Sequence, residues 1–438
     1  MNGSIRSRGL GLFAAIAFAV GNMVGAGVFV LSGLVIQTAG PSAVFSYLFC
    51  GIIVAFSGLS YAALASIYPE DGGGYLYAKR MLGPFPGFLA GWAMYISLSI
   101  ASAFVLLGFG IYTNLLIGTS YDPRIFAIVG VVFLTGLNLR GLSEAGKVEI
   151  ALVVSKVAIL LAFIMAGLFY VSRTDFQPFF PAGAGGMLEG MTMVFFAYLG
   201  FQVVALMAGE VKEASRNVPL ATLGAIVIVA FIYTGVIIAI LSASLPSYGS
   251  NSVFDAAVVL FGSFGGIVVS LGAVFSTLSA ANANILGGSR IILEMATEKQ
   301  IPGNIARLYY NQPIYPVLFG SAIAVALIAI GNLDFVVNLT NVTTLATMTL
   351  VNLSALLLVL REHRIPPEKS YFRLPLGYFI PIAGAVSCIA MLLTLSPHIL
   401  FLGFTMLFAG LGVYLIEDTP EGVEIREKIR GILGRAGK

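Results

Sequence analysis

The stretch Gly21-Asn-Met-Val-Gly25-Ala26-Gly27-Val28-Phe29 interrupts the first long apolar run of the chain. Its three glycines each weaken a helix by about 1 kcal/mol relative to alanine, and they allow the backbone to unwind and approach a ligand. Two interpretations fit this stretch by itself. Gly21 and Gly25 can form a small-xxx-small surface for helix packing, or the helix can break here.

A second apolar run is interrupted in a similar way, at Phe195-Phe196-Ala197-Tyr198-Leu199-Gly200-Phe201-Gln202. Two interrupted runs, five helices apart, are typical of an inverted repeat of five plus five helices, in which each break exposes amide and carbonyl groups near the middle of the membrane. The amino-terminal end of a half-helix attracts a carboxylate, and free carbonyls accept hydrogen bonds from an ammonium group. The pair therefore favours broken helices and predicts a site for a zwitterionic amino acid.

Composition places the chain in lipid. A soluble globular chain has about 45–50% apolar and about 25% charged residues, whereas this chain of 438 residues has 58% hydrophobic and 10% charged residues. This excludes a cytosolic enzyme, a nucleic-acid-binding protein and a disordered chain. A helix needs about 20 apolar residues to cross the hydrocarbon. Twelve apolar runs lie near 10–36, 41–67, 85–116, 125–138, 148–171, 188–210, 219–244, 264–289, 313–331, 333–360, 377–394 and 398–416.

The basic residues predict the orientation. With a cytoplasmic amino terminus, 20 of the 23 Lys and Arg residues fall in the inside loops and the carboxy-terminal tail. Only Arg124 and Arg173 fall outside, and Lys156 lies within a span. Because cytoplasmic loops carry an excess of Lys and Arg, we expect a multi-pass protein of the plasma membrane with both termini in the cytoplasm. The basic tail is expected to contact anionic lipid.

Sequence features of an enzyme or a metal site are missing. His363 and His398 lie in loops predicted on opposite sides of the membrane, so no metal cluster or Ser/His pair is available. Cys50 and Cys388 both lie in apolar runs, which indicates no disulfide framework. We therefore expect no enzyme activity, no cofactor and no metal.

Lys156 lies about eight residues into the span that starts at Val148, about 12 Å from that end of the helix. A lysine at this depth costs a few kcal/mol or more unless it is paired or reaches water. Its side chain can snorkel to the interface. Alternatively it is a titrating group, because burial favours the neutral form of an amine, and its protonation then follows the transport cycle. When charged, its ammonium can fill a place that sodium would otherwise occupy.

Three further polar residues have a structural and a functional interpretation each. Asn282, like Asn284 in the same span, either contacts substrate or bridges helices, since buried amides do both. Glu210 is either a gate or proton carrier, or it caps its helix and pairs with a nearby cation such as Lys212 or Arg216.

The chain resembles the amino acid–polyamine–organocation superfamily over nearly its whole length. The resemblance lies in GAGVF at 25–29, PEDGGGYLY at 69–77, FAYLGF at 196–201, the segment from Glu210 to Arg216-Asn217-Val218-Pro219, SAANA at 279–283 with Ser289-Arg290 and Met295-Ala296, and FRLP at 372–375. Each motif is weak alone, and together in this order they are highly specific.

The resemblance implies an all-α membrane protein with the leucine-transporter-type fold. Two inverted five-helix repeats (1–172 and 173–361) precede two peripheral helices (362–416) and a cytoplasmic tail (417–438), and helices 1 and 6 of twelve are broken. The implied substrate-binding residues are Met23, Gly25, Ala26, Gly27, Phe196, Leu199 and Gly200. The amides of Ala26 and Gly27 would bind the carboxylate, carbonyls near Met23, Phe196 and Leu199 would bind the amino group, and Phe196 would be an aromatic gate.

By the same resemblance, Lys156 corresponds to the fifth-helix lysine of sodium-independent members. Antiporters for charged substrates have an acidic residue where this chain has Gln202, so we expect a neutral substrate. The expected function is proton-coupled, sodium-independent transport of neutral amino acids by alternating access. An exchanger and a non-transporting amino-acid sensor are the alternatives; a channel would need a continuous polar lining.

Overall fold

The computed structural model describes residues 9–140, 146–172, 176–206, 208–309, 312–361 and 371–416. These residues are almost entirely helical, with one two-stranded antiparallel pair. The elements are α1 (Leu12–Met23), η1 (Gly27–Leu31, a π-helix), α2 (Ser32–Ala39), η2 (Gly40–Ser42), α3 (Ala43–Ile67), α4 (Gly73–Leu82), α5 (Pro84–Ile117), α6 (Pro123–Leu139), α7 (Gly146–Tyr170), α8 (Gly183–Ala197), α9 (Val203–Leu206), η4 (Ala208–Glu210), α10 (Ala214–Ser242), α11 (Ser252–Thr297), η5 (Gly303–Ala306), β1 (Leu308–Tyr309), β2 (Gln312–Pro313), α12 (Ile314–Ile330), α13 (Leu333–Leu360), α14 (Phe379–Leu393) and α15 (Pro397–Ile416).

The helices have the length and composition of membrane spans. Within the described residues, seven helical stretches are long and apolar enough to cross a membrane, and α1, α6, α12 and α14 are shorter apolar helices. Large apolar side chains on the outer helices are exposed, among them Phe133, Phe169, Phe264, Leu393 and Phe401. An apolar surface of this extent is not found on soluble monomers, so the chain is a multi-pass membrane protein.

The first apolar run is broken where its glycines predict. Helix α1 ends at Met23, and Val24 leaves the helical conformation with φ −77° and ψ 71°. The Gly25 amide turns back to donate to Met23 O at 2.8 Å. The chain then re-enters helical structure as the π-helix η1, which continues into α2.

The second interrupted run has the same construction. Helix α8 ends at Ala197, residues 198–202 form turns, and the helical path resumes with the short α9 and η4. Gly200 has φ +122°, a conformation that side chains with a Cβ rarely adopt. Both breaks therefore lie at glycines that the sequence singles out.

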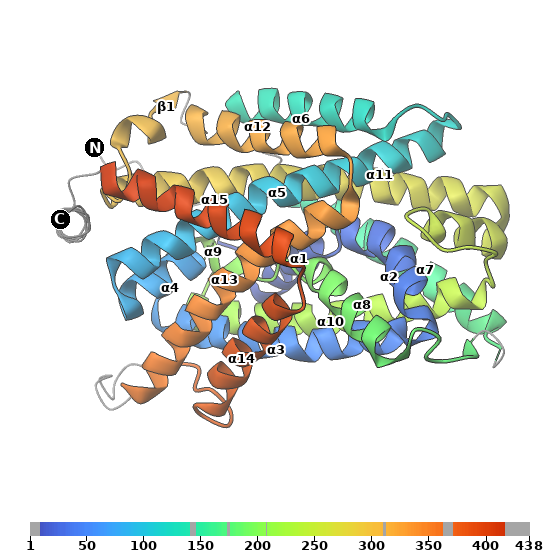
Figure 1. Cartoon of the computed structure of the whole chain (residues 1–438), viewed down its shortest axis with the longest axis horizontal. Helices are drawn as coiled ribbons and strands as arrows, with labels where there is room; N and C mark the ends of the chain where they lie inside the picture. Colours follow the sequence, from blue (N-terminus) through green and yellow to red (C-terminus); the bar gives the residue numbers. More distant parts are fainter. Residues whose placement is uncertain are drawn as a thin grey trace, which may run out of the picture.

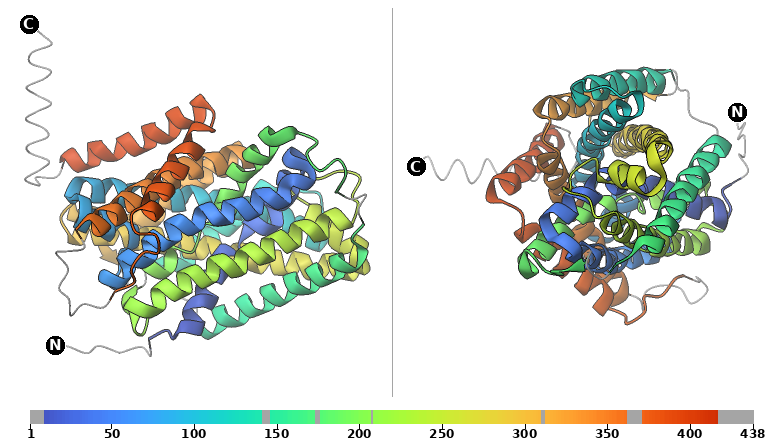
Figure 2. Two further views of the ribbon diagram at one scale, coloured as in Figure 1. Left: turned by 90° about the horizontal axis from the view of Figure 1, so that it is seen from below. Right: turned by 90° about the vertical axis from the view of Figure 1, so that its right-hand side faces the viewer.

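The broken helices lie inside the bundle and other helices surround them. Helix α1 packs against α7, α10 and α11, and α8 packs against α2, α3 and α13. Most long helices run along the long axis of the molecule, with α5 and α11 side by side (Figure 1). Helices α14 and α15 lie at the periphery on α13 (Figure 2).

Two parts of the fold differ from what the apolar runs predict. The motif at 69–77 lies between two apolar runs and leads into a helix of its own, α4, which starts after Gly72 in a left-handed conformation (φ +117°). Helix α11 extends beyond the apolar run 264–289 and bends at Gly262, where φ is +70°. The predicted basic tail at 417–438, Arg173, His363 and residues 1–8 lie outside the described residues.

Candidate substrate-binding pocket

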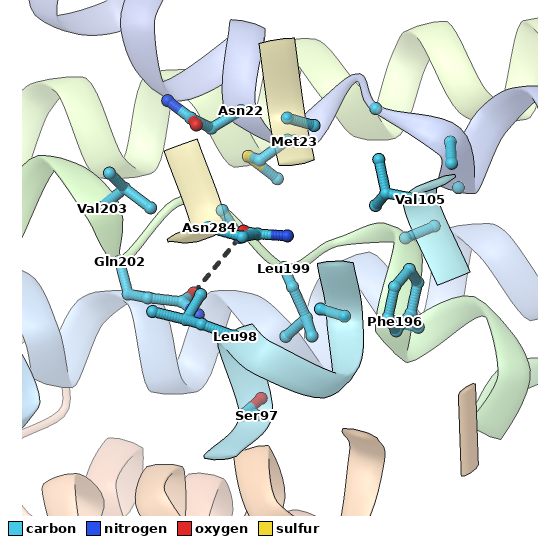
Figure 3. A pocket seen from close by; sticks show the side chains of 17 residues that line it. Asn22, Met23, Ser97, Leu98, Val105, Phe196, Leu199, Gln202, Val203 and Asn284 are labelled. Atoms are coloured by element: carbon cyan, nitrogen blue, oxygen red, sulfur yellow. Dashed lines mark hydrogen bonds between the residues drawn. The ribbon is translucent and has the colours of Figure 1, made fainter. Parts of the chain in front are cut away.

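A pocket lies where the two breaks face each other. Its atom-free space is about 550 Å³, which includes the part open to solvent. All seven residues that the resemblance implies for substrate binding line it: Met23, Gly25, Ala26, Gly27, Phe196, Leu199 and Gly200. The other lining residues are Asn22, Ser97, Leu98, Ala101, Val105, Ala197, Gln202, Val203, Ala280 and Asn284 (Figure 3).

The break in α1 frees backbone carbonyls, and side chains from three other helices satisfy them. Lys156 Nζ on α7 donates to Gly21 O at 2.5 Å. Ser276 Oγ on α11 donates to Val24 O at 2.5 Å, and Tyr233 OH on α10 contacts Met23 O at 2.6 Å. A buried carbonyl without a partner is costly, so these contacts stabilise the unwound backbone.

Lys156 does not snorkel to the interface. Only 4% of the residue is exposed, and besides Gly21 O its ammonium contacts Ser276 Oγ at 3.4 Å. The side chain therefore joins α7 to α1 and α11 at the break. It does not line the pocket, so it contacts the broken helix from behind the surface that faces a substrate.

Tyr233 connects the two breaks, and nothing in the sequence singles it out beyond a tyrosine in an apolar run. Its hydroxyl lies 2.6 Å from Met23 O at the end of α1 and 2.9 Å from Ala197 O at the end of α8. The residue is fully buried. A phenol has one proton, so the two carbonyls share a single donor.

Glycines allow the two broken helices to touch along their backbones. A Cβ on Gly27 would lie 2.8 Å from both Cα and Cβ of Ala197, and one on Gly200 would lie 2.8 Å from the carbonyl carbon of Asn22. Gly21 in turn packs closely on Val153 of α7. The two interpretations of the first stretch are thus both correct, because its glycines serve packing as well as the break.

The two ends of the pocket differ in polarity. At one end Phe196 contacts Phe104 edge to face, with ring centroids 4.6 Å apart. Away from that end, the lining has three carboxamides: Gln202 from the turn before α9, Asn284 from α11, and Asn22 from α1, whose Nδ2 donates to Phe18 O at 2.9 Å (Figure 3). No lining residue is charged.

Asn282, a candidate from the sequence, lies away from the pocket. Its Oδ1 accepts a hydrogen bond from Asn138 Nδ2 of α6 at 2.8 Å. The structure therefore gives Asn282 the helix-bridging position, while Asn284, two residues further along α11, lines the pocket.

Glu210 also lies outside the pocket lining, at the end of the molecule that holds Leu10. It pairs with a cation, as one of the two interpretations expected, but this cation is neither Lys212 nor Arg216. Glu210 instead pairs with Arg290 of α11 at 3.6 Å, because the turn after α9 brings it to the end of that helix. Its backbone carbonyl accepts from Leu10 N at 2.8 Å, so Leu10 is bound here as well.

Comparisons with known proteins identify the family of the chain. The family model for amino acid permeases matches residues 10–416. The chain belongs to the amino acid permease family. It is 28% identical to the methylthioribose transporter of Bacillus subtilis (strain 168), covering 94% of this chain and 93% of the relative.

Two further relatives come from the same strain. The branched-chain amino acid permease BcaP is 25% identical, covering 93% of this chain and 92% of the relative. The serine/threonine exchanger SteT is 28% identical, covering 92% and 95%. Family membership makes this amino acid permease homologue a membrane transporter and not an enzyme.

Proposed function

We propose that this permease carries neutral amino acids across the plasma membrane by alternating access, coupled to protons and independent of sodium. Twelve spans would form two inverted five-helix repeats, 1–172 and 173–361, with the peripheral helices at 362–416. Support comes from the two broken helices, which lie five apolar runs apart and share one pocket. The distribution of basic residues supports cytoplasmic termini.

The pocket suits a zwitterion. Helix η1 starts at Gly27, and the first amides of a helix have no partner within it, so the amides of Ala26 and Gly27 are suited to a carboxylate. Carbonyls near Met23, Phe196 and Leu199 would accept from the ammonium group. These backbone groups belong to the two breaks, so a bound amino acid would join the broken helices to each other.

The position of Lys156 is the observation that carries the coupling. Its ammonium lies between a carbonyl of the broken α1 and Ser276 of α11, where a monovalent cation would find oxygen ligands. A protonated lysine there would replace sodium. Deprotonation would turn the charged donor to Gly21 O into a neutral amine, which donates more weakly, and would loosen the contact of α1 with α7. The proton would in this way be linked to a movement of the broken helix.

Exchange of one amino acid for another is the alternative, favoured by the similarity to a serine/threonine exchanger. The named relatives differ in substrate, from a methylthioribose transporter to a branched-chain amino acid permease. Overall sequence similarity therefore does not identify the substrate of this chain. The substrate has to be inferred from the residues that line the pocket.

The test is radiolabelled amino acid uptake into proteoliposomes with imposed pH or sodium gradients. We expect the pH gradient to drive uptake and sodium to have no effect. Lys156→Ala should abolish the pH-driven accumulation, while Lys212→Ala, which removes an exposed basic residue, should retain it. Sodium-stimulated uptake, or a Lys156→Ala protein with unchanged pH response, would show that the role given to Lys156 is wrong.

A further inference from the structure

We propose that the pocket selects amino acids with a short, uncharged, hydrogen-bonding side chain, a hydroxyl or a carboxamide, and that Gln202 and Asn284 recognise it. The inference builds on the proposed amino acid transport and names the substrate class of the same pocket.

The first observation is an unused donor in a buried carboxamide. Gln202 is only 9% exposed and lines the pocket. Its Oε1 accepts a hydrogen bond from the Gly200 amide at 3.3 Å, which fixes the orientation of the group. Within the described part of the chain, Gln202 Nε2 has no hydrogen-bond partner, so both its protons are available to a ligand.

The second observation is a carboxamide on a different helix that faces the same space. Asn284 of α11 lines the same pocket as Gln202 (Figure 3). Among the described residues its side chain has no hydrogen-bond partner, so it offers two donors and an acceptor. A ligand group with both a donor and an acceptor, such as a hydroxyl, matches this pair.

The lining excludes other side chains. It contains no charged residue, and a buried charge without a counter-charge is strongly unfavourable. Its apolar walls, which are Leu98, Ala101 and Val105 on α5 and Phe196 on α8, limit the size of the ligand. A purely apolar ligand side chain would leave the Gln202 and Asn284 donors without partners, which a pocket tolerates poorly.

A substrate side chain that binds Gln202 would also act on the second break, at residues 198–202. Gln202 follows Gly200 by two residues, and its oxygen is bonded to the Gly200 amide. A ligand that binds Gln202 Nε2 therefore contacts a group that is already joined to the unwound backbone. The side chain of the substrate and its zwitterionic end would act on the same break.

The experiment compares nearly isosteric pairs in proteoliposomes. Uptake of threonine and valine, and of serine and alanine, is measured as kcat/KM for the purified full-length protein. We expect at least about 10-fold preference for the hydroxyl member of each pair, the value of one hydrogen bond. Gln202→Met and Asn284→Leu keep the approximate size of each side chain and remove its hydrogen bonding, so each should reduce the threonine to valine ratio toward one.

Asn138→Leu is the matched control, because it removes a buried carboxamide that does not line the pocket. The ratio does not depend on how much protein folds, so a poorly folding variant remains informative as long as uptake is detectable. If either pocket variant yields no uptake, equilibrium binding of threonine and valine to that same purified variant is measured instead, with the same expected reduction.

Amino acid uptake in which valine competes as well as threonine would overturn this inference and leave the proposed function intact. A strong preference that Gln202→Met and Asn284→Leu both preserve would overturn the assignment to these residues. Absence of uptake for every amino acid would overturn the proposed function, and this inference with it.

Discussion

The hydroxyl of Tyr233 is one oxygen atom shared by the two breaks, and Tyr233→Phe removes it alone. The change leaves Ala197 O without the donor at 2.9 Å. Met23 O retains the Gly25 amide at 2.8 Å, so it loses less. A buried carbonyl left without a partner costs about 1–3 kcal/mol. We therefore take about 2 kcal/mol as the cost to the arrangement in which the two breaks face one pocket.

A cost of this size lowers the population of that arrangement by up to about 30-fold. Apparent affinity falls by the same fraction, because a ligand must first restore the competent conformation. We expect the Kd for substrate, measured by scintillation proximity with radiolabelled ligand, to rise by about 10- to 30-fold. Thermal unfolding is followed with a thiol-reactive dye, since Cys50 and Cys388 are both buried and free.

Tyr95→Phe is the control for lost stability. Its hydroxyl donates to Pro316 O of α12 at 2.6 Å, and it does not line the pocket. This variant should unfold at a lower temperature and bind substrate normally. If Tyr233→Phe behaves in the same way as Tyr95→Phe, with lower Tm and unchanged Kd, then Tyr233 has only a packing role and the reasoning is refuted.

Two further changes test the contacts around the pocket. Gly27→Ala places a Cβ 2.8 Å from the backbone of Ala197 and should cost about 1–3 kcal/mol by overpacking with loss of uptake. Gly185→Ala has no atom within 4 Å of its Cβ, so normal uptake is expected; equal effects of both would contradict the crossing contact. Glu210→Gln removes the ion pair with Arg290. The Glu210 side chain is 46% exposed and the Arg290 side chain 57%, so a double-mutant cycle of the two residues, measured by thermal unfolding, should give a coupling energy of at most about 1 kcal/mol. A larger coupling energy would contradict this expectation and would mean that the ion pair is a major contribution to stability.

The breaks were predictable because the residue type, glycine, determines how flexible the backbone is at each position. Glycines cluster at 21–27 and Gly200 interrupts an apolar run, so both departures from the helix have a local cause. The buried position of Lys156 was predictable in the same way, from a charge within an apolar run. Its contact with Gly21 O was not, since it depends on where α7 packs.

Other parts of the site depend on helix rotation and long-range packing. Asn282 and Asn284 are two positions apart, so they lie about 200° apart around α11. One bonds to Asn138 and the other lines the pocket. Nothing local to α5 distinguishes Ser97 or Leu98 from its other apolar and small residues. The partner of Glu210 lies 80 residues further along the chain, so it cannot be predicted from the residues near Glu210 in the sequence.

The contact of the two broken helices through bare backbone has a mechanical consequence. Ordinary helices in contact are separated by side chains, which can change rotamer while one helix slides past the other. At Gly27 and Gly200 no side chains separate the two segments, and the main chain of one break lies against the main chain of the other break. A tilt of α1 would therefore push directly on the end of α8. The carboxylate end and the amine end of a bound amino acid would be released in a single movement.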